Sequence, residues 1–125
     1  MQFHNNKDKV IIIDFGSQVT KLIARRVREL GVYSEVITPQ ELKKFKSYQN
    51  IRGFIFSGGP STVTSKKFPT VPNDIFKKKI PILGICYGLQ LIAKIFGGKI
   101  KPSKKRREFG RAYLFKKRNS LLINK

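Results

Sequence analysis

Apolar residues along the chain form short β-branched runs separated by stretches with helical spacing. Residues 10–13 form a continuous β-branched run, which predicts a strand buried on both faces, as in a parallel sheet. The next segment predicts a helix, with Ser17 as its N-cap and Gly31 just beyond its C-terminus. Its apolar residues fall on one predicted stripe: Val19, Leu22, Ile23, Val27 and Leu30.

The alternation continues as far as Gly98. Further strands are predicted at 33–37, 53–56 and 80–85, and weaker helices at 40–45 and 73–78. A longer helix is predicted after the turn at 86–88, ending at the Gly97-Gly98 pair. Strands that alternate with helices in this way predict an α/β fold with a doubly wound, mostly parallel sheet. Beyond Gly98 the pattern loosens, and we expect antiparallel edge strands near residues 99–101 and 111–115.

Composition narrows the class of protein. The 125 residues, 40% of them apolar, are enough for one domain with a packed core. The single cysteine, Cys86, excludes an intramolecular disulfide, and one Cys with one His does not make a common zinc site, so no metal is expected. Without an export signal or an apolar run long enough for a bilayer, we expect a cytoplasmic protein with no membrane partner.

The formal net charge of +20 raises the alternative of a protein that binds nucleic acid. The 19 Lys outnumber the 8 Arg and are scattered along the chain, whereas bidentate recognition of bases and phosphates favours Arg. Composition therefore disfavours nucleic acid as a partner, and a basic nucleic-acid-binding protein is kept only as an alternative.

The most informative motif is Gly84-Ile85-Cys86-Tyr87-Gly88, at the predicted passage from strand to helix. A residue at the apex of such a tight turn has crowded neighbours, and glycines two before and two after it relieve the crowding, as in a nucleophile elbow. Cys86 is therefore a candidate nucleophile, and the helix start, including the N–H of Tyr87, is suited to hold an oxyanion. In the alternative interpretation, Cys86 is a small buried apolar residue.

A second motif, Ser57-Gly58-Gly59-Pro60, follows another predicted strand. Because ligands bind beyond the carboxyl ends of parallel strands, this turn is expected near Cys86, where its N–H groups could supply a second oxyanion donor. A plain Gly-Pro turn is the alternative. A base for the thiol is hard to find: His4, the only histidine, is expected on the surface, and Asp14 and Glu108 are the only carboxylates expected near this end of the sheet.

Together these segments resemble the N-terminal glutaminase domain of the GMP synthase family, within the class I glutamine amidotransferases. Gly-Gly-Pro and the Cys86 motif are shared by the class, whereas the segments that single out the GMP synthase family are 14–18 (Asp-Phe-Gly-Ser-Gln), 86–90 (Cys-Tyr-Gly-Leu-Gln) and 107–110 (Arg-Glu-Phe-Gly). The resemblance implies a flavodoxin-like fold. It also implies a polar N-terminal segment at 1–8 followed by a partial amidotransferase domain at 9–125, incomplete at its C-terminus.

By this resemblance, Cys86 attacks the side-chain amide of glutamine, Gly59 and Tyr87 hold the oxyanion through backbone N–H groups, and Gly58 and Gln90 bind the substrate. The ammonia passes to an ATP pyrophosphatase domain, which uses ATP and Mg to aminate XMP to GMP. The motifs for that domain and for the His and Glu of the triad are not found in this sequence. We therefore expect a chain without a cofactor that is inactive alone; the alternative is a non-catalytic module that acts with a partner chain.

Overall fold

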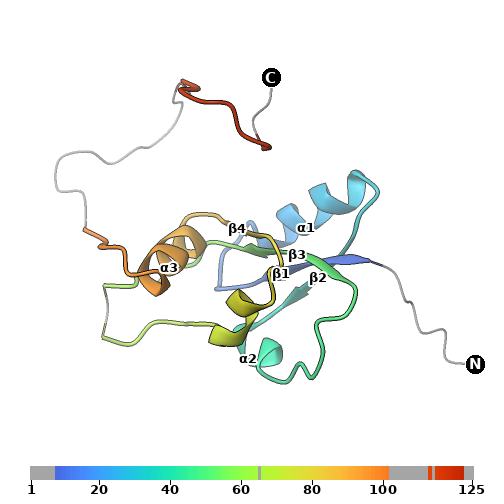
Figure 1. Ribbon diagram of the computed structural model, residues 1–125, viewed down its shortest axis with the longest axis horizontal. Helices are drawn as coiled ribbons and strands as arrows, with labels where there is room; N and C mark the ends of the chain where they lie inside the picture. The colour runs from blue at the N-terminus through green and yellow to red at the C-terminus, as the bar shows by residue number, and fades with distance from the viewer. Residues whose placement is uncertain (1–7, 65, 102–112, 114, 123–125) are drawn as a thin grey trace, which may run out of the picture.

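The computed structural model describes residues 8–64, 66–101, 113 and 115–122. Strands and helices alternate along most of this length (Figure 1). In chain order the elements are β1 (Lys9–Ile13), α1 (Thr20–Glu29), β2 (Tyr33–Ile37), α2 (Pro39–Leu42), β3 (Ile51–Phe56), the 3-10 helix η1 (Asn73–Lys77), β4 (Ile82–Gly84) and α3 (Tyr87–Ile95).

The strands form one parallel sheet of four strands in the order β2-β1-β3-β4. The chain starts in the interior of the sheet, moves to β2 on one side and then crosses to β3 and β4 on the other. All carboxyl ends therefore lie at one end of the sheet, which confirms the predicted doubly wound α/β fold. This arrangement brings the turns that follow β1, β3 and β4 together.

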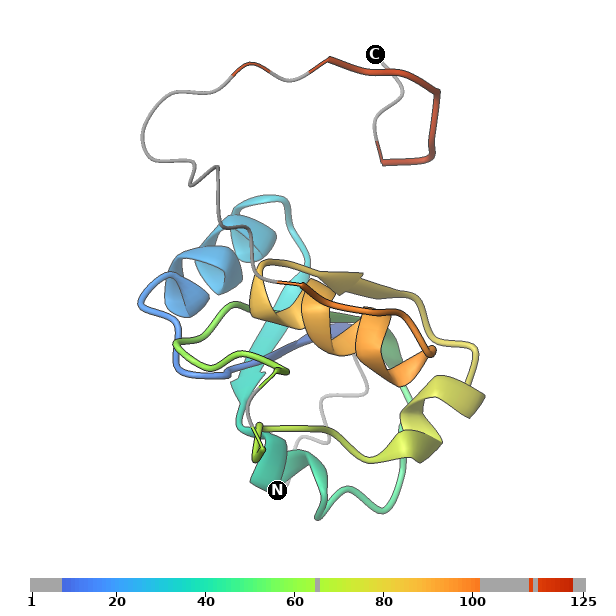
Figure 2. The same cartoon turned by 90° about the vertical axis from the view of Figure 1, so that its left-hand side faces the viewer.

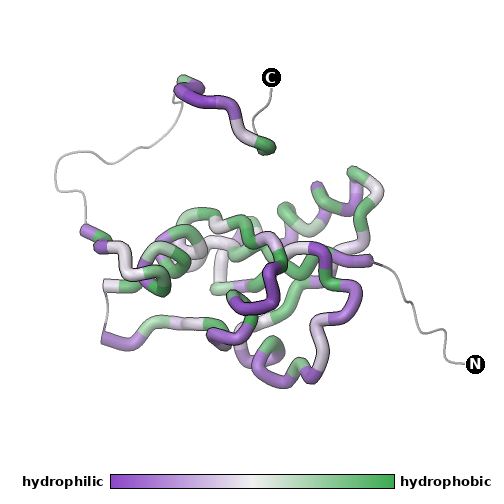
Figure 3. Tube along the Cα trace, viewed as in Figure 1, coloured by the Kyte–Doolittle hydropathy of each residue, from purple (hydrophilic) through white to green (hydrophobic). Residues whose placement is uncertain are grey.

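Helices cover both faces of the sheet. Helix α1 packs on β1 and β2 from one face, whereas α2, η1 and α3 lie on the other (Figures 1 and 2). The main core fills the second face and joins alternate residues of β1 and β3 to the covering helices: Ile11, Ile13, Phe54, Phe56, Leu42, Ile75 and Leu91. In Figure 3, apolar segments lie along the sheet and α3, whereas polar segments lie in the loops. No helix in the described part of the chain has the length and apolar character needed to cross a membrane.

Several sequence predictions need correction at their boundaries. Strand β3 begins at Ile51, two residues earlier than predicted, and β4 is limited to Ile82–Gly84 because Pro81 precedes it and the elbow follows it. Residues 99–101 form no strand, so the first predicted edge strand is wrong, and the second, at 111–115, lies largely outside the described residues. The expected N-terminal segment 1–8 also lies outside them, except for Asp8.

The start of α1 differs from the prediction. Its N-cap is Val19, not Ser17, and no side chain caps this end. The Ser17 hydroxyl instead accepts a hydrogen bond from the Val19 N–H at 3.1 Å, within the turn before the helix. At the other end, Gly31 has φ of 80° beyond the C-cap, as predicted.

Candidate functional site

Cys86 occupies the connection between β4 and α3, as the N-cap of that helix. Its φ is 51° and its ψ is −116°, a left-handed conformation that a residue with a Cβ adopts only under constraint. The side chain is exposed, so the alternative of a buried structural cysteine is wrong. An exposed thiol on a strained turn between a strand and a helix has the geometry of a nucleophile elbow.

The two glycines that flank Cys86 are required by close contacts. A Cβ on Gly84 would come within 2.8 Å of the Leu89 backbone N and Cα, on the first turn of α3. A Cβ on Gly88 would overlap the backbone of Phe56, with only 2.6 Å to its carbonyl carbon. Because neither glycine has a Cβ, α3 can start directly against β3 and β4. The spacing of the motif predicted this role for the two glycines.

The turn after β3 approaches Cys86 from the neighbouring strand. A Cβ on Gly58 would lie 3.3 Å from the Cβ of Cys86, so the two backbones are close. Gly59 packs on the Phe15 backbone, and a Cβ there would overlap the Phe15 carbonyl group. The predicted meeting of the Gly-Gly turn with Cys86 is therefore confirmed.

A pocket of about 430 Å³ opens at this end of the sheet. Its walls are the Cys86 side chain, the turn after β3 and the segment between β1 and α1; the lining residues are Gly16, Ser17, Gln18, Val19, Gly58, Gly59, Pro60 and Cys86. In the described part of the chain, the backbone N–H groups of Gly59 and Tyr87 donate to no protein acceptor. Gly59 lines the pocket and Tyr87 directly follows Cys86, so these two N–H groups are candidates for holding an oxyanion.

A buried polar network lies beneath this pocket. The Ser57 hydroxyl, with no exposed surface, donates to the Ile13 carbonyl at 2.7 Å and accepts from the Thr20 hydroxyl at 3.0 Å. Asp14 joins the network because its Oδ1 lies 3.3 Å from the Thr20 hydroxyl, and the same oxygen accepts from the Gly16 N–H at 2.8 Å. The network joins the end of β1, the start of α1 and the end of β3. Sequence reasoning missed the roles of Ser57 and Thr20, because the two residues are 37 positions apart and neither belongs to a periodic pattern.

The side chain of Tyr87 points into the core and is almost fully buried. Its ring lies 5.0 Å from that of Phe15, between ring centroids, and its hydroxyl donates to the Pro69 carbonyl. Burial raises the pKa of the Tyr87 hydroxyl. The side chain thus anchors the first turn of α3, and only the backbone of Tyr87 is available to a ligand.

The remaining predicted site residues are placed as follows. Gln90 is half-buried, and its Oε1 faces the Thr62 hydroxyl at 3.5 Å; it does not line the Cys86 pocket. The Asp14 carboxylate already accepts hydrogen bonds from the Gly16 N–H and the Thr20 hydroxyl in the network described above. His4 and Glu108 lie outside the described residues, within which no imidazole or carboxylate lines the pocket.

The class of protein follows from comparison with known families. The profile of the family "Glutamine amidotransferase class-I" matches residues 11–124, which is nearly the whole chain. The chain therefore belongs to the class I glutamine amidotransferases, as the elbow and the facing Gly-Gly turn indicate.

More specific similarity is to GMP synthases. The chain is 49% identical over 121 residues to the glutamine-hydrolysing GMP synthase of Borreliella burgdorferi strain N40, covering 94% of this chain and 23% of that protein. The corresponding enzyme of Pediococcus pentosaceus is 48% identical over 112 residues, covering 86% of this chain and 21% of that protein. Among solved structures, a GMP synthase subunit from Thermoplasma acidophilum matches with a TM-score of 0.59 and 30% identity, covering 86% of this chain and 53% of that one. The chain spans less than a quarter of the length of these curated relatives.

Proposed function

We propose that this chain supplies the nucleophile and the oxyanion site of a glutaminase. Cys86 Sγ attacks the side-chain carbonyl carbon of glutamine, forming a carbon–sulfur bond and a tetrahedral oxyanion. The carbon–nitrogen bond then breaks, the nitrogen takes up a proton and leaves as ammonia, and a thioester remains on Cys86. Water hydrolyses the thioester to release glutamate and restore the thiol. The observation that carries the proposal is the left-handed, exposed Cys86 between the crowded Gly84 and Gly88.

The oxyanion is assigned to the backbone N–H groups of Gly59 and Tyr87. Both groups lack a protein acceptor in the described residues, and the buried contacts of Gly59 with Phe15 and of the Tyr87 ring with the core fix their positions. Rigid donors of this kind stabilise developing charge without having to reorganise during the reaction. Gly58 and Gln90 are proposed to contact the glutamine. Gly58 lies on the pocket wall, whereas Gln90 does not line the pocket and its Oε1 faces the Thr62 hydroxyl.

The proton transfers need a base and an acid that the Cys86 pocket does not contain within the described residues. We therefore propose that the isolated chain hydrolyses glutamine no faster than its Cys86→Ala form. In the complete reaction, we propose that the ammonia aminates XMP to GMP, with ATP used by a pyrophosphatase domain, as the sequence resemblance implies. The names of the relatives, glutamine-hydrolysing GMP synthases, support glutamine as the nitrogen source and GMP as the product.

Covalent labelling tests the nucleophile without requiring turnover. A glutamine analogue with a chloroketone in place of the amide is expected to add once to the chain, at Cys86, as measured by mass spectrometry of the intact and digested protein. Glutamine should slow the labelling, and Cys86→Ala should prevent it. Equal labelling rates with the glutamine analogue and with a chloroketone that lacks the amino-acid portion would contradict a glutamine site.

A second candidate is a module that is non-catalytic by itself and acts by pairing with another polypeptide that carries the remainder of the domain. It is favoured by the outer edge of β4, which pairs with no other strand among the described residues, and by an apolar pocket of about 370 Å³ beside it. Val10, Ile55 and Leu83 are among the residues that line this pocket.

Co-expression tests this second candidate. The chain is combined with the part of the Borreliella burgdorferi relative that lies beyond the aligned region, and glutamine hydrolysis is measured as glutamate release. Cys86-dependent release by the mixture, with none from either part alone, is expected. A stable complex that releases no glutamate in a Cys86-dependent way would contradict this second candidate.

A further inference from the structure

A second pocket lies at the opposite end of the sheet from Cys86, where the strands begin. It has a volume of about 520 Å³ and is formed by the segment leading into β3 and by the turn after η1. We call it the basic pocket. Its walls include Phe45, Lys46, Tyr48, Arg52, Lys78 and Ile80. The volume is within the range of pockets that bind small organic ligands, roughly 300 to 1,000 Å³.

Tyr48 holds the two walls of the basic pocket together. Its hydroxyl donates to the carboxylate of Asp74, at 3.2 and 3.4 Å from the two oxygens, across 26 positions of sequence. The Lys78 ammonium lies 5.7 Å from the centroid of the Tyr48 ring, a cation–π distance, and Phe45 and Phe54 flank the same ring at 6.3 and 6.2 Å. Tyr48 therefore links the two segments that form the basic pocket.

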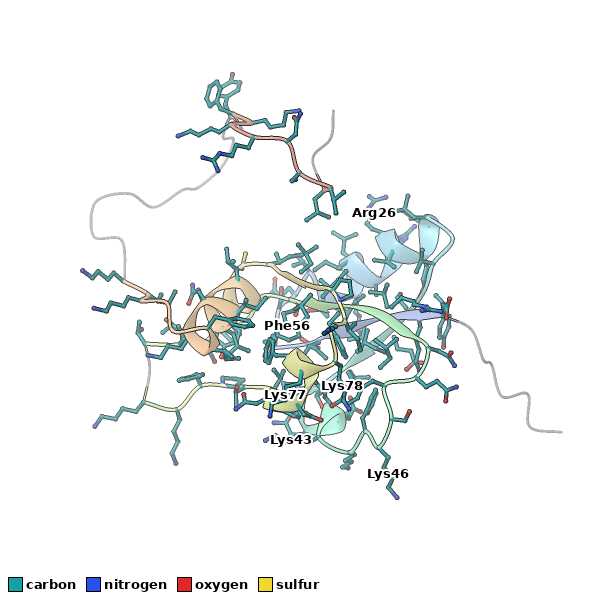
Figure 4. All side chains as sticks on the ribbon, viewed as in Figure 1. Arg26, Lys43, Lys46, Phe56, Lys77 and Lys78 are labelled. Carbon is teal, nitrogen blue, oxygen red and sulfur yellow. The ribbon has the colours of Figure 1, made fainter. Side chains whose placement is uncertain are left out.

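The formal net charge of the basic pocket is positive. Three basic residues, Lys46, Arg52 and Lys78, line it together with one acidic residue, Asp74, which accepts from the Tyr48 hydroxyl. Four further lysines lie in the same two segments, 43–52 and 73–80. Arg52 is paired with Asp8 at 2.9 Å, whereas Lys46 and Lys78 form no ion pair within the described part of the chain. Figure 4 shows both lysines on one side of the molecule, together with Lys43 and Lys77.

Backbone donors add to this charge. The N–H groups of Lys46, Ser47 and Tyr48 donate to no acceptor among the described residues, although the neighbouring Gln49 N–H donates to the Ser47 hydroxyl. Three consecutive residues with free N–H groups therefore line the same pocket as Lys46 and Lys78, a combination that suits an anion that accepts several hydrogen bonds. Phe45, Tyr48 and Ile80 supply an apolar wall next to these donors.

We propose that the basic pocket binds a nucleoside 5′-monophosphate. Lys46 and Lys78 hold the phosphate, since Lys binds phosphate as a point charge, and the base and sugar lie against the wall formed by Phe45, Tyr48 and Ile80. An inorganic anion would use only the charged part of the pocket, whereas a nucleotide uses both parts and fits the volume. This site is separate from the Cys86 pocket and does not depend on the proposed glutaminase function.

Isothermal titration of the full chain with guanosine 5′-monophosphate, inorganic phosphate and guanosine tests the proposal. The nucleotide should bind at least about tenfold more tightly than either of its parts, because each part makes only a share of the contacts. The double variant Lys46→Ala/Lys78→Ala should weaken nucleotide binding at least about tenfold, as expected for the loss of charge-assisted hydrogen bonds.

The matched control is Lys21→Ala/Lys94→Ala, which removes the same charge from exposed positions on α1 and α3. This control should bind the nucleotide within about twofold of the unmodified chain, since screening leaves distant surface charges with little effect. Equal losses in the two double variants would show unspecific attraction to a basic protein and overturn the proposal. No binding at millimolar nucleotide, with unchanged unfolding midpoints, would overturn it as well.

Discussion

The two ends of the sheet are built in different ways. At the carboxyl end, Cys86 and the Gly58–Gly59 turn are held by close contacts between backbones, so that an added Cβ at Gly59 or Gly88 would overlap a carbonyl group. At the amino end, long side chains from two distant segments enclose the basic pocket, and a single tyrosine links them. The first end tolerates almost no change in shape, whereas the second is defined by charge.

This difference predicts how the two ends respond to substitution. Backbone contacts in a packed region cannot relax without moving a strand or a helix, so changes there act on the free energy of unfolding. Exposed lysines contribute little to stability, so changes at the amino end should act on ligand affinity alone. The following experiments test the contrast, beginning with the largest expected effect.

Gly88→Ala should lower the free energy of unfolding by about 3 kcal/mol or more, because the new methyl group would overlap the Phe56 backbone. Gly97→Ala is the control, because Gly97 has φ of 83° but no atom lies within 4 Å of where its Cβ would be. This variant should lose only about 1–2 kcal/mol of unfolding free energy, the cost of the left-handed conformation for alanine. Lys78→Ala, which removes a cation–π contact with the Tyr48 ring, should lower the free energy of unfolding by no more than about 1 kcal/mol. Urea unfolding measures all three. Similar values for the two glycine variants would refute the crowding argument.

Ser57→Ala should lower the free energy of unfolding by about 1–3 kcal/mol, because the Thr20 hydroxyl would lose a buried partner. Ser17→Ala, whose hydroxyl accepts only from the nearby Val19 N–H in an exposed turn, should lower it by no more than about 1 kcal/mol. The labelling rate of Cys86 should fall in the Ser57 variant if the network positions the Gly-Gly turn. An unchanged rate would limit Ser57 to a role in stability.

Cys86→Gly should raise the free energy of unfolding by about 1 kcal/mol, since glycine adopts the left-handed conformation without strain. Cys86→Ala keeps a Cβ at the same φ and should leave stability nearly unchanged, which separates backbone strain from loss of the thiol. Thermal and urea unfolding of both variants measure the difference. A Gly variant no more stable than the Ala variant would show that the elbow stores little strain.

The smallest expected effect concerns pH. Burial raises the pKa of the Tyr48 hydroxyl, and the charge of Asp74 and the hydrogen bond to it act in the same direction. The folded-state pKa therefore exceeds the unfolded value of about 10, so the corresponding stability is complete below about pH 10 and is lost as pH rises through the folded pKa. Above about pH 10, Tyr48→Phe should lose stability less steeply than the unmodified chain. The free energy of unfolding of both proteins is measured by urea unfolding at a series of pH values. Parallel curves of this free energy against pH would contradict the assignment to Tyr48.

Local patterns in the sequence were enough to predict the sheet and the elbow. The run at 33–37 forms β2 as predicted, and the spacing of Gly84 and Gly88 around Cys86 corresponds to real backbone contacts. Both features depend on residues that are close in sequence and have strong conformational preferences. The meeting of Gly58 with Cys86 was also predictable, because parallel strands bring their carboxyl ends together.

Features that depend on distant polar contacts were not predictable in this way. The apolar stripe predicted Leu30 in the buried face of α1, yet Leu30 is 83% exposed, and the helix instead buries Thr20 and Ala24. A polar contact accompanies this orientation: the Ser34 hydroxyl of β2 donates to the Ala24 carbonyl at 3.1 Å. Likewise, no local pattern connects Tyr48 with Asp74. The sequence therefore showed scattered lysines but did not predict that two segments form the basic pocket.

The short outer strand β4 has a consequence for the behaviour of the protein in solution. Leu83 at this edge is 39% exposed, and an open edge with apolar side chains favours association between molecules. The net charge of +20 opposes this through long-range repulsion between molecules. Salt shortens the range of that repulsion to about 8 Å at physiological ionic strength. Colloidal stability should therefore decline as salt is added, and dilute low-salt buffers are the conditions in which the chain remains dispersed.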